Sequence, residues 1–267
     1  PVLTRASRRC RVWSAGVAIG CATAPTTSAP AVHQTATSIL AAGAPPTAAP
    51  AFHGTLTDDA GTQVTLTREP QKIVSLTPAT TETLFAIGAG SRIVGKVQDP
   101  ANYPPEAASI PEVASYKGVD VEKIIASGAD LVISGGKGLT QGDAVDQLRR
   151  ANVAVIVSYP TTVNSAVDGI RLIGKAVGLA TEAGTLADTM RSQLDALSLI
   201  ASTADQRPRV FYEIDITGGI FTPPADSIYS EMFGLAGSEP IAGDANYSIS
   251  PENLVAADPE VILPRAG

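Results

Sequence analysis

The side chains best suited to chemistry in this sequence follow segments whose apolar pattern predicts buried strands. In open α/β sheets, ligands bind beyond the carboxyl ends of the strands. Hydroxyl, carboxylate and aromatic groups at such places can hold a ligand without reacting with it. This rule predicts ligand contacts from Thr77, Pro78, the loop from Asp99 to Tyr103, residues 135–137, Tyr159, residues 215–217, Phe221 and Thr222.

Catalytic and metal chemistry is poorly supported. The only two histidines, His33 and His53, lie in or beside a stretch rich in Ala, Thr and Pro, so the folded part lacks a histidine base and a histidine set for zinc or manganese. No nucleophile elbow occurs, no carboxylate pair stands out, and Gly135-Gly136-Lys137 lacks phosphate-loop spacing. We therefore expect a protein that is not an enzyme, with no metal site and no cofactor.

Two pairs of similar stretches occur in the same order along the chain. Residues 120–133 (DVEKIIASGADLVI) align without a gap with residues 250–263 (SPENLVAADPEVIL). Before them, residues 84–95 (LFAIGAGSRIVG) align with residues 232–243 (MFGLAGSEPIAG). The repetition predicts two lobes of one design.

Each copy of the longer stretch predicts a short helix followed by a buried strand. In the first copy Asp120 caps the helix, Glu122 lies in its first turn, and Ile124 and Ile125 face inward. The second copy places Glu252 where the first has Glu122. The two carboxylates are therefore equivalent in the repeat.

Helices and strands alternate through the first half of the folded region. A hairpin at 55–66 turns at Gly61, and Thr77 with Pro78 starts a helix that runs to about residue 88. The other predicted elements are strands at 73–76, 92–97, 131–133 and 153–157 and a helix at 143–150. This alternation favours a parallel sheet covered on both faces.

Two helices separate the predicted lobes. Apolar residues at helical spacing predict one helix over 163–177, ended by Gly178. A second stripe, Leu186, Met190, Leu194, Leu197 and Ala201, predicts a helix over 181–202 about 30 Å long, enough to cross between lobes. A strand over 209–215 then opens the second lobe, followed by a helix near 227–235.

The two ends of the chain suggest an exported fragment. Residues 1–21 have four arginines, a short apolar run and a lipobox-like sequence, Ala18 to Cys21, that predicts an export signal and lipidation of Cys21. Residues 22–53 predict a flexible tether. The expected domains are then a binding lobe at 54–160, helices at 161–207 and an incomplete second lobe at 208–267.

The charge of the chain disfavours some partners. Four arginines and no acidic residue precede Cys21, so removal of the signal takes the formal net charge from −7 to about −11. An acidic surface is unsuited to nucleic acid and to anionic lipid. We expect no nucleic-acid partner, and contact with a membrane only through a lipid anchor.

Several motifs resemble substrate-binding proteins of ABC importers for cobalamin, haem and ferric siderophores. They are the hairpin, KIVSLTPATTETLFAIGAG, the NYPPEA loop, VEKIIASGADLVIS and RVFYEID, and the likeness runs from about residue 55 to the end. It implies an α/β fold of two parallel-sheet lobes joined by one long linking helix, the class III periplasmic binding protein type, with the second lobe truncated here. It also implies a small-molecule ligand between the lobes, and as partners an ABC permease and, through it, an ATPase.

The resemblance gives Glu122 and Glu252 a role. In this family one Glu on each lobe docks into arginine pockets of the permease, and these two match. The alternative is that an acid in a first helical turn only interacts with the helix dipole, worth about 0.3–1 kcal/mol.

Tyr116 is the strongest single candidate for ligand contact by resemblance. Cobalamin-binding relatives place a stacking Trp here, and haem-binding relatives have an iron-ligating Tyr within one residue. A flat aromatic face suits a corrin or porphyrin. The alternative is a tyrosine packed at a lobe edge. Where some cobalamin relatives carry a binding Tyr, this chain has Asp99 and Pro100, a departure that weakens the cobalamin assignment.

The ligand remains open between three classes. RVFYEID and SIYSEMFGLAG are most similar to the cobalamin-binding branch. An anionic siderophore would favour arginines in the cleft, and the second lobe offers only Arg207, Arg209 and Arg265. Haem stays open because one Tyr could ligate iron. The function expected first is capture of cobalamin or a related corrinoid in the periplasm or at the outer face of the cytoplasmic membrane. The alternatives are haem or siderophore binding, and a structural surface lipoprotein.

Overall fold

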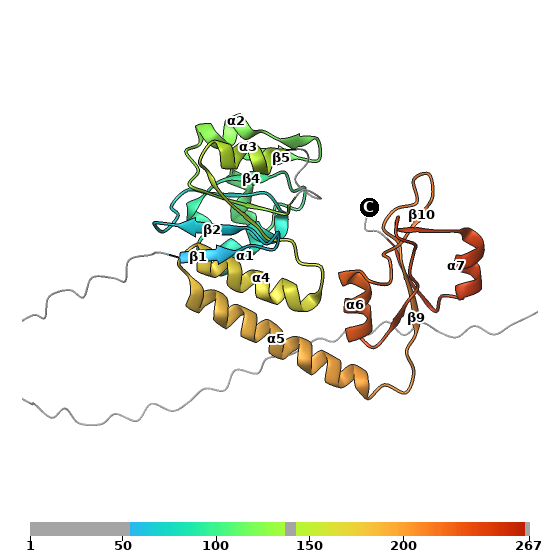
Figure 1. Ribbon diagram of the computed structural model, residues 1–267. Coiled ribbons are helices and arrows are strands. Elements are labelled where there is room, and N and C mark those ends of the chain that lie inside the picture. The colour runs from blue at the N-terminus through green and yellow to red at the C-terminus, as the bar shows by residue number, and fades with distance from the viewer. Residues whose placement is uncertain (1–53, 137–142, 265–267) are drawn as a thin grey trace, which may run out of the picture. The chain divides into compact units, whose positions relative to one another are not determined.

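The computed structural model describes residues 54–136 and 143–264 (Figure 1). The predicted signal, tether and lipidated Cys21 lie outside these residues, as do Lys137, Arg265 and both histidines. Within the described ranges, no helix combines the length and apolar character that a membrane span requires.

The first two strands form the predicted hairpin. β1 (Gly54–Thr57) pairs antiparallel with β2 (Gln63–Leu66). Asp58 Oδ1 accepts hydrogen bonds from Ala60 N and Thr62 N, and Gly61 turns the chain with φ +75°. A positive φ is accessible to glycine without steric cost, so the turn forms where the sequence predicted it.

The first lobe is built on a six-stranded sheet. Its order is β6-β5-β4-β3-β7-β8, with every pair parallel except β5–β6. The strands are β3 (Ile73–Ser75), β4 (Ile93–Val97), β5 (Glu112–Ser115), β6 (Gly118–Val119), β7 (Leu131–Ser134) and β8 (Ala154–Val157). β5 and β6 were not predicted, because each is short and carries little apolar pattern.

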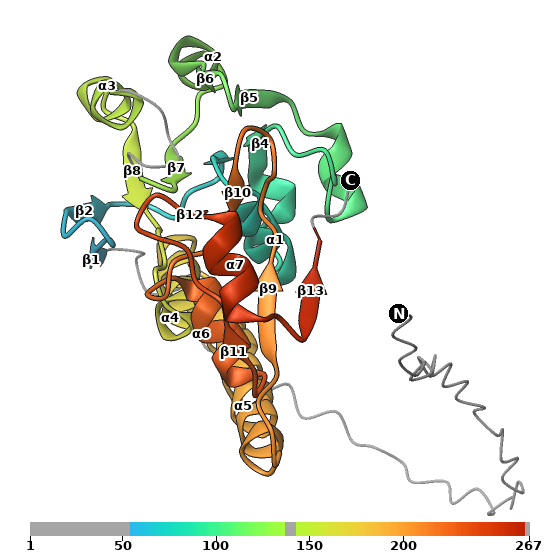
Figure 2. The same cartoon turned by 90° about the vertical axis from the view of Figure 1, so that its right-hand side faces the viewer.

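Helices cover both faces of this sheet (Figure 2). Alternate strand residues enter two separate cores: Ile73 packs with α1 and α4, and Val74 packs with α2 and α3. The helices are α1 (Pro78–Ala86), α2 (Val121–Ala126), α3 (Ala144–Arg150) and α4 (Val163–Ala176), with short 3₁₀ turns η1 (Gly90–Arg92) and η2 (Pro105–Ser109). The covered parallel sheet is therefore confirmed.

The α2 prediction needs one correction. Asp120 caps the helix by accepting from Lys123 N, and Ile124 is fully buried, as expected. Ile125 is 44% exposed and does not face inward. Successive helical residues point about 100° apart, so two neighbours cannot share the centre of one buried face.

The long helix α5 (Ala180–Ser202) packs beside α4 and also contacts α6 (Ile228–Leu235) of the second lobe (Figure 1). Its 23 residues span about 35 Å at 1.5 Å per residue. A Cβ on Gly174 would lie 2.1 Å from Ala183 Cβ, so glycine permits the close approach of α4 and α5. The predicted apolar stripe was partly wrong: Ala183 and Ala187 are the buried residues, and Leu197 is 56% exposed.

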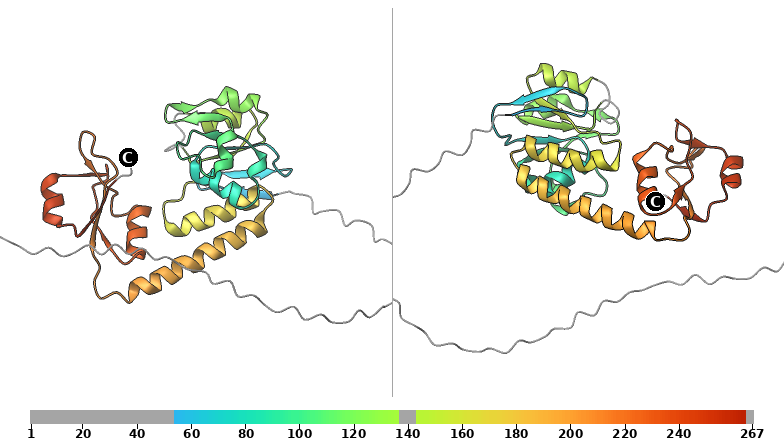
Figure 3. Two further views of the ribbon diagram at one scale, coloured as in Figure 1. Left: turned by 180° about the vertical axis from the view of Figure 1, so that it is seen from behind. Right: turned by 60° about the horizontal axis from the view of Figure 1, so that its bottom comes forward.

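The second lobe repeats the central topology of the first. β9 (Arg209–Tyr212) lies between two parallel neighbours, β11 (Glu239–Pro240) and β13 (Val261–Leu263). The helices α6 (Ile228–Leu235) and α7 (Pro251–Ala257) flank β9 on opposite sides (Figure 3). The order β11-β9-β13 corresponds to β4-β3-β7, as the repeat predicted. β9 ends three residues earlier than expected, and β10 (Ile220–Phe221) pairs antiparallel with β12 (Ser248–Ile249).

Candidate functional site

A cavity of about 1010 Å³ lies at the carboxyl edge of the first-lobe sheet. The N-terminus of α1, which follows β3, and the loop after β8 both line it. Tyr103, α4, α5 and the start of α6 complete the wall. Both lobes therefore contribute to one cavity, at the edge where open α/β sheets bind ligands.

The wall of this cavity is mostly apolar. Its large apolar and aromatic members include Phe85, Ile170, Ile173, Met190 and Tyr229. The charged residues among the described wall are Glu82 and Glu106, both acidic. Such a wall suits a large ligand with apolar faces and offers no cation to an anionic one.

Thr77 and Pro78 line the cavity through the first turn of α1. Thr77 Oγ1 accepts from Thr80 N at 3.1 Å and donates to Thr80 Oγ1 at 2.8 Å. The cap holds the turn in place, and Pro78 is set for the first helical position by its fixed φ. The structure therefore places both predicted residues at the cavity, with Thr77 occupied mainly in capping.

Tyr103 reaches the cavity from a loop fastened to a buried lysine. Lys96 on β4 is 1% exposed, and its Nζ donates to Asn102 Oδ1 at 3.3 Å and lies 3.8 Å from Glu112 Oε1. Asp99 Oδ1 accepts from Ala101 N within the same loop. These contacts position Tyr103, which is 58% exposed.

Tyr229 enters the wall from the second lobe and is part of an aromatic cluster. Its ring centroid lies 5.9 Å from that of Tyr212, which lies 5.9 Å from that of Phe233. Tilted pairs at this distance are favourable arrangements for aromatic rings. The cluster fixes Tyr229 from β9 and α6.

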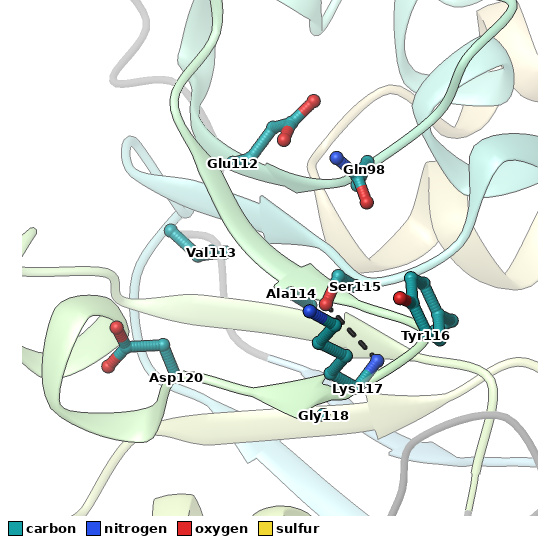
Figure 4. A pocket seen from close by; sticks show the side chains of 9 residues that line it. All are labelled: Gln98, Glu112, Val113, Ala114, Ser115, Tyr116, Lys117, Gly118 and Asp120. Carbon is teal, nitrogen blue, oxygen red and sulfur yellow. Dashed lines mark hydrogen bonds between the residues drawn. The ribbon is translucent and has the colours of Figure 1, made fainter.

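Tyr116 lies in a different place, a smaller pocket of about 530 Å³ (Figure 4). The pocket is formed by β5 and the turn between β5 and β6, together with Gln98 and Asp120. The Tyr116 side chain is 77% exposed, and Lys117 Nζ lies 5.6 Å from its ring centroid. Tyr116 therefore does not line the larger cavity.

The other predicted contacts line neither of these two pockets. Asp99 is half-buried, and Tyr159 is 46% exposed between Ser158 and Pro160, which do line the cavity. Phe221 lies on β10. Thr222 is fully buried and its hydroxyl donates to Ile241 O, so its side chain presents no exposed face to a ligand.

Glu122 and Glu252 lie in equivalent first turns of α2 and α7. The caps are also equivalent, because Asp120 Oδ1 accepts from Lys123 N at 2.9 Å and Ser250 Oγ accepts from Asn253 N at 3.1 Å. Both carboxylates are exposed, and neither has an ion pair with another described residue.

The comparison with known proteins decides the family. Residues 73–266 match the model of the periplasmic binding protein family. The chain belongs to that family. An ABC transporter substrate-binding lipoprotein of Bacillus subtilis (strain 168), YvrC, is 32% identical over 217 residues, which cover 79% of this chain and 68% of the relative. A vitamin B12-binding protein of Yersinia pestis (strain Pestoides F) is 28% identical over 196 residues, 72% and 69% of the two chains.

Solved structures of the family share the fold. The periplasmic vitamin B12-binding protein BtuF of Vibrio cholerae superposes with a TM-score of 0.65 at 25% identity, covering 73% of this chain and 76% of that one. The periplasmic heme-binding protein RhuT of Roseiflexus sp. RS-1 gives 0.65 at 26% identity over the same shares. The resemblance and the class III fold predicted from the sequence are thereby confirmed.

The family membership settles the coarse function of this periplasmic binding protein. It is a substrate-binding protein of an ABC importer of the B12, haem and siderophore type. Its homologues are extracytoplasmic, which implies a permease as partner and a small molecule as ligand. Members of the family bind solutes and are not enzymes.

Sequence reasoning missed most of the apolar wall. Phe85, Ile170, Ile173 and Tyr229 follow helical spacing, and the same spacing serves a helix packed on a core. The one available signal was position, since α4 begins shortly after β8, which ends on the ligand edge.

Proposed function

We propose that this protein captures cobalamin or a related corrinoid outside the cytoplasm and delivers it to its ABC permease. The observation that carries the proposal is the cavity of about 1010 Å³, apolar in its wall and lined by tyrosines from both lobes. Its size lies at the upper end of small-molecule sites, as a ligand with a macrocycle requires. The vitamin B12-binding relatives support the same ligand.

In this proposal Tyr103 and Tyr229 place flat faces against the ligand, and the first turn of α1 at Thr77 and Pro78 forms one side. Tyr116, Asp99, Tyr159 and Phe221 are further contacts for those parts of a large ligand that extend beyond the cavity. An aromatic face supplies contact area at little cost in conformational freedom.

Delivery depends on Glu122 and Glu252, one on each lobe, which dock into cationic pockets of the permease. Their exposure and their lack of partners among the described residues leave both carboxylates available. We also propose that Cys21 carries the lipid anchor, that residues 22–53 form the tether, and that the lobes comprise 54–160 and 208–267 around linking helices at 161–207.

Haem is the second candidate. Tyr103 and Tyr116 are both more than half exposed, and a phenolate can ligate haem iron. The heme-binding relative RhuT is as similar to this chain as the cobalamin-binding one. A ferric siderophore is less well supported, because the charged residues of the described cavity wall are both acidic.

Calorimetric titration with cyanocobalamin, haemin and a ferric siderophore tests the proposal. We expect cyanocobalamin to bind with submicromolar affinity. Tyr103→Ala should weaken binding by about 2 kcal/mol, roughly thirtyfold, and Tyr116→Ala by less. Haemin binding with a tyrosinate–iron absorption band would transfer the proposal to haem. If none of the three binds, cobalamin and haem are both refuted as ligands.

A further inference from the structure

The turn of the β1–β2 hairpin is bonded to the strand and loop that lead into the cavity wall. Asp59 N donates to Val157 O at 3.0 Å, and Val157 N donates to Asp58 Oδ2 at 3.1 Å. Beyond β8, Tyr159 N donates to Asp59 Oδ2 at 2.7 Å. The hairpin turn is therefore hydrogen-bonded both to the end of β8 and to the loop after it, which carries Ser158 and Pro160.

The hydrogen bond from Tyr159 N to Asp59 Oδ2 holds the middle of this loop in place. Ser158 N donates to Ser134 O at 2.8 Å, and Thr161 N donates to Ser165 Oγ at 3.1 Å, so both ends are fixed. Between them, Pro160 has no N–H, which leaves Tyr159 N as the one backbone donor. Its acceptor is a carboxylate at short distance, a strong type of hydrogen bond.

The two aspartates of the turn have separate tasks. The Asp58 carboxylate is fully buried and accepts from four donors, Ala60 N, Thr62 N, Val157 N and Arg149 Nη2. It stabilises the fold. Asp59 is exposed, and its carboxylate accepts from Tyr159 N across 100 positions of sequence. Removing the Asp59 carboxylate leaves the buried network of Asp58 in place.

We propose that Asp59 is a positioning residue of the binding site, which holds the Tyr159–Pro160 segment in the geometry that the ligand requires. Ser158 and Pro160 line the cavity on either side of Tyr159, so a shift of this segment alters the wall directly. The hairpin precedes residues 73–266, the part matched to the family. A segment outside the matched region thus takes part in recognition. This inference rests on the proposed function of the cavity.

Three variants test it. Asp59→Ala removes the acceptor, Asp59→Asn keeps an oxygen that can accept from Tyr159 N, and Asp205→Ala removes an exposed loop carboxylate elsewhere. Each is titrated with cyanocobalamin and haemin, and NMR measures hydrogen exchange of the Tyr159 amide without ligand. We expect Asp59→Ala to bind about tenfold more weakly and to exchange at Tyr159 about tenfold faster, with only a small fall in the unfolding midpoint. Asp59→Asn and Asp205→Ala should match the wild type closely.

Equal binding by Asp59→Ala and the wild type would overturn the inference, as would losses of equal size in the Asn and Ala variants. If the wild type binds neither probe, the proposed ligands fail, and the exchange rates at Tyr159 still decide whether Asp59 orders the segment. Unchanged exchange in Asp59→Ala would reject the positioning role whatever the ligand.

Discussion

The two lobes share one strand topology, but their equivalent strands are buried to different degrees. In the first lobe β7 lies between β3 and β8, and Leu131, Val132 and Ile133 are fully buried. In the second, the equivalent strand β13 is at the edge of the described three-stranded sheet, and Ile262 is 57% exposed. Within the described residues, the repeated strand is thus buried between two neighbours in the first lobe and exposed at a sheet edge in the second.

The acidic residues that precede β7 and β13 make similar contacts in the two lobes. Asp130 accepts from Gln71 N at 3.0 Å and Lys72 N at 2.9 Å, where the chain enters β3. Its counterpart Glu260 accepts from Arg209 N at 3.0 Å, at the start of β9. Each carboxylate joins the repeated strand to the central strand of its own sheet. Local contacts repeat between the lobes, whereas burial depends on what packs around them.

The largest expected difference is in the repeated strands. Leu131→Ala should lower the free energy of unfolding by about 2–5 kcal/mol, because it leaves a cavity in a closed core. Ile262→Ala should cost less than about 1 kcal/mol, because more than half of that side chain is already in water. Denaturant unfolding measures both. Equal losses would contradict the difference in burial.

Loss of the Asp130 carboxylate should likewise lower the free energy of unfolding more than loss of the Glu260 carboxylate, but the difference should be smaller. Asp130→Ala removes the acceptor of two backbone donors at a side chain 15% exposed, and should cost about 2–3 kcal/mol. Glu260→Ala removes one such acceptor at a side chain 51% exposed, and should cost about 1 kcal/mol. The same unfolding experiment compares them. A larger loss for Glu260→Ala would break the ranking.

The helix caps of α2 and α7 should contribute equally to stability. Asp120→Ala and Ser250→Ala each remove one side-chain acceptor from the first turn of a short helix. Each should cost about 1 kcal/mol. Thermal unfolding tests the equality, and a difference of more than about 1 kcal/mol would show that the two helix starts are not equivalent.

The smallest effect on stability is expected at Glu122 and Glu252, where function should change most. Glu122→Ala and Glu252→Ala should each alter the free energy of unfolding by less than about 1 kcal/mol, the scale of a helix-dipole contact. Each should nevertheless reduce ligand uptake by cells that carry the permease, and the double variant should abolish it. Glu182→Ala is the matched control, since Glu182 also lies exposed in the first turn of a helix. A similar fall in uptake with Glu182→Ala would count against docking.

Much of the fold was predictable because its signals are local. The Thr77–Pro78 helix start, the turn at Gly61 and the repeat around Asp120 and Ser250 all appear where the sequence placed them. The errors within the predicted helices concern burial. The exposure of Ile125 and of Leu197 depends on which neighbours reach the helix, and an apolar pattern does not specify these.

Part of the wall of the candidate cavity was also predictable from the sequence. The strand-end rule found Thr77, Pro78 and Tyr103, because sheet topology fixes where strands end. It did not find Phe85 or Ile170, because apolar residues of a helix have the same spacing in the sequence whether they face a core or a cavity. Tyr116, selected by resemblance, lines a separate pocket.

The most direct test of the central claim is a crystal structure of the protein grown with cyanocobalamin. We expect corrinoid density in the larger cavity, against Tyr103 and Tyr229 and beside the first turn of α1. Density confined to the smaller pocket at Tyr116, or a ligand-free cavity under saturating cyanocobalamin, would contradict it.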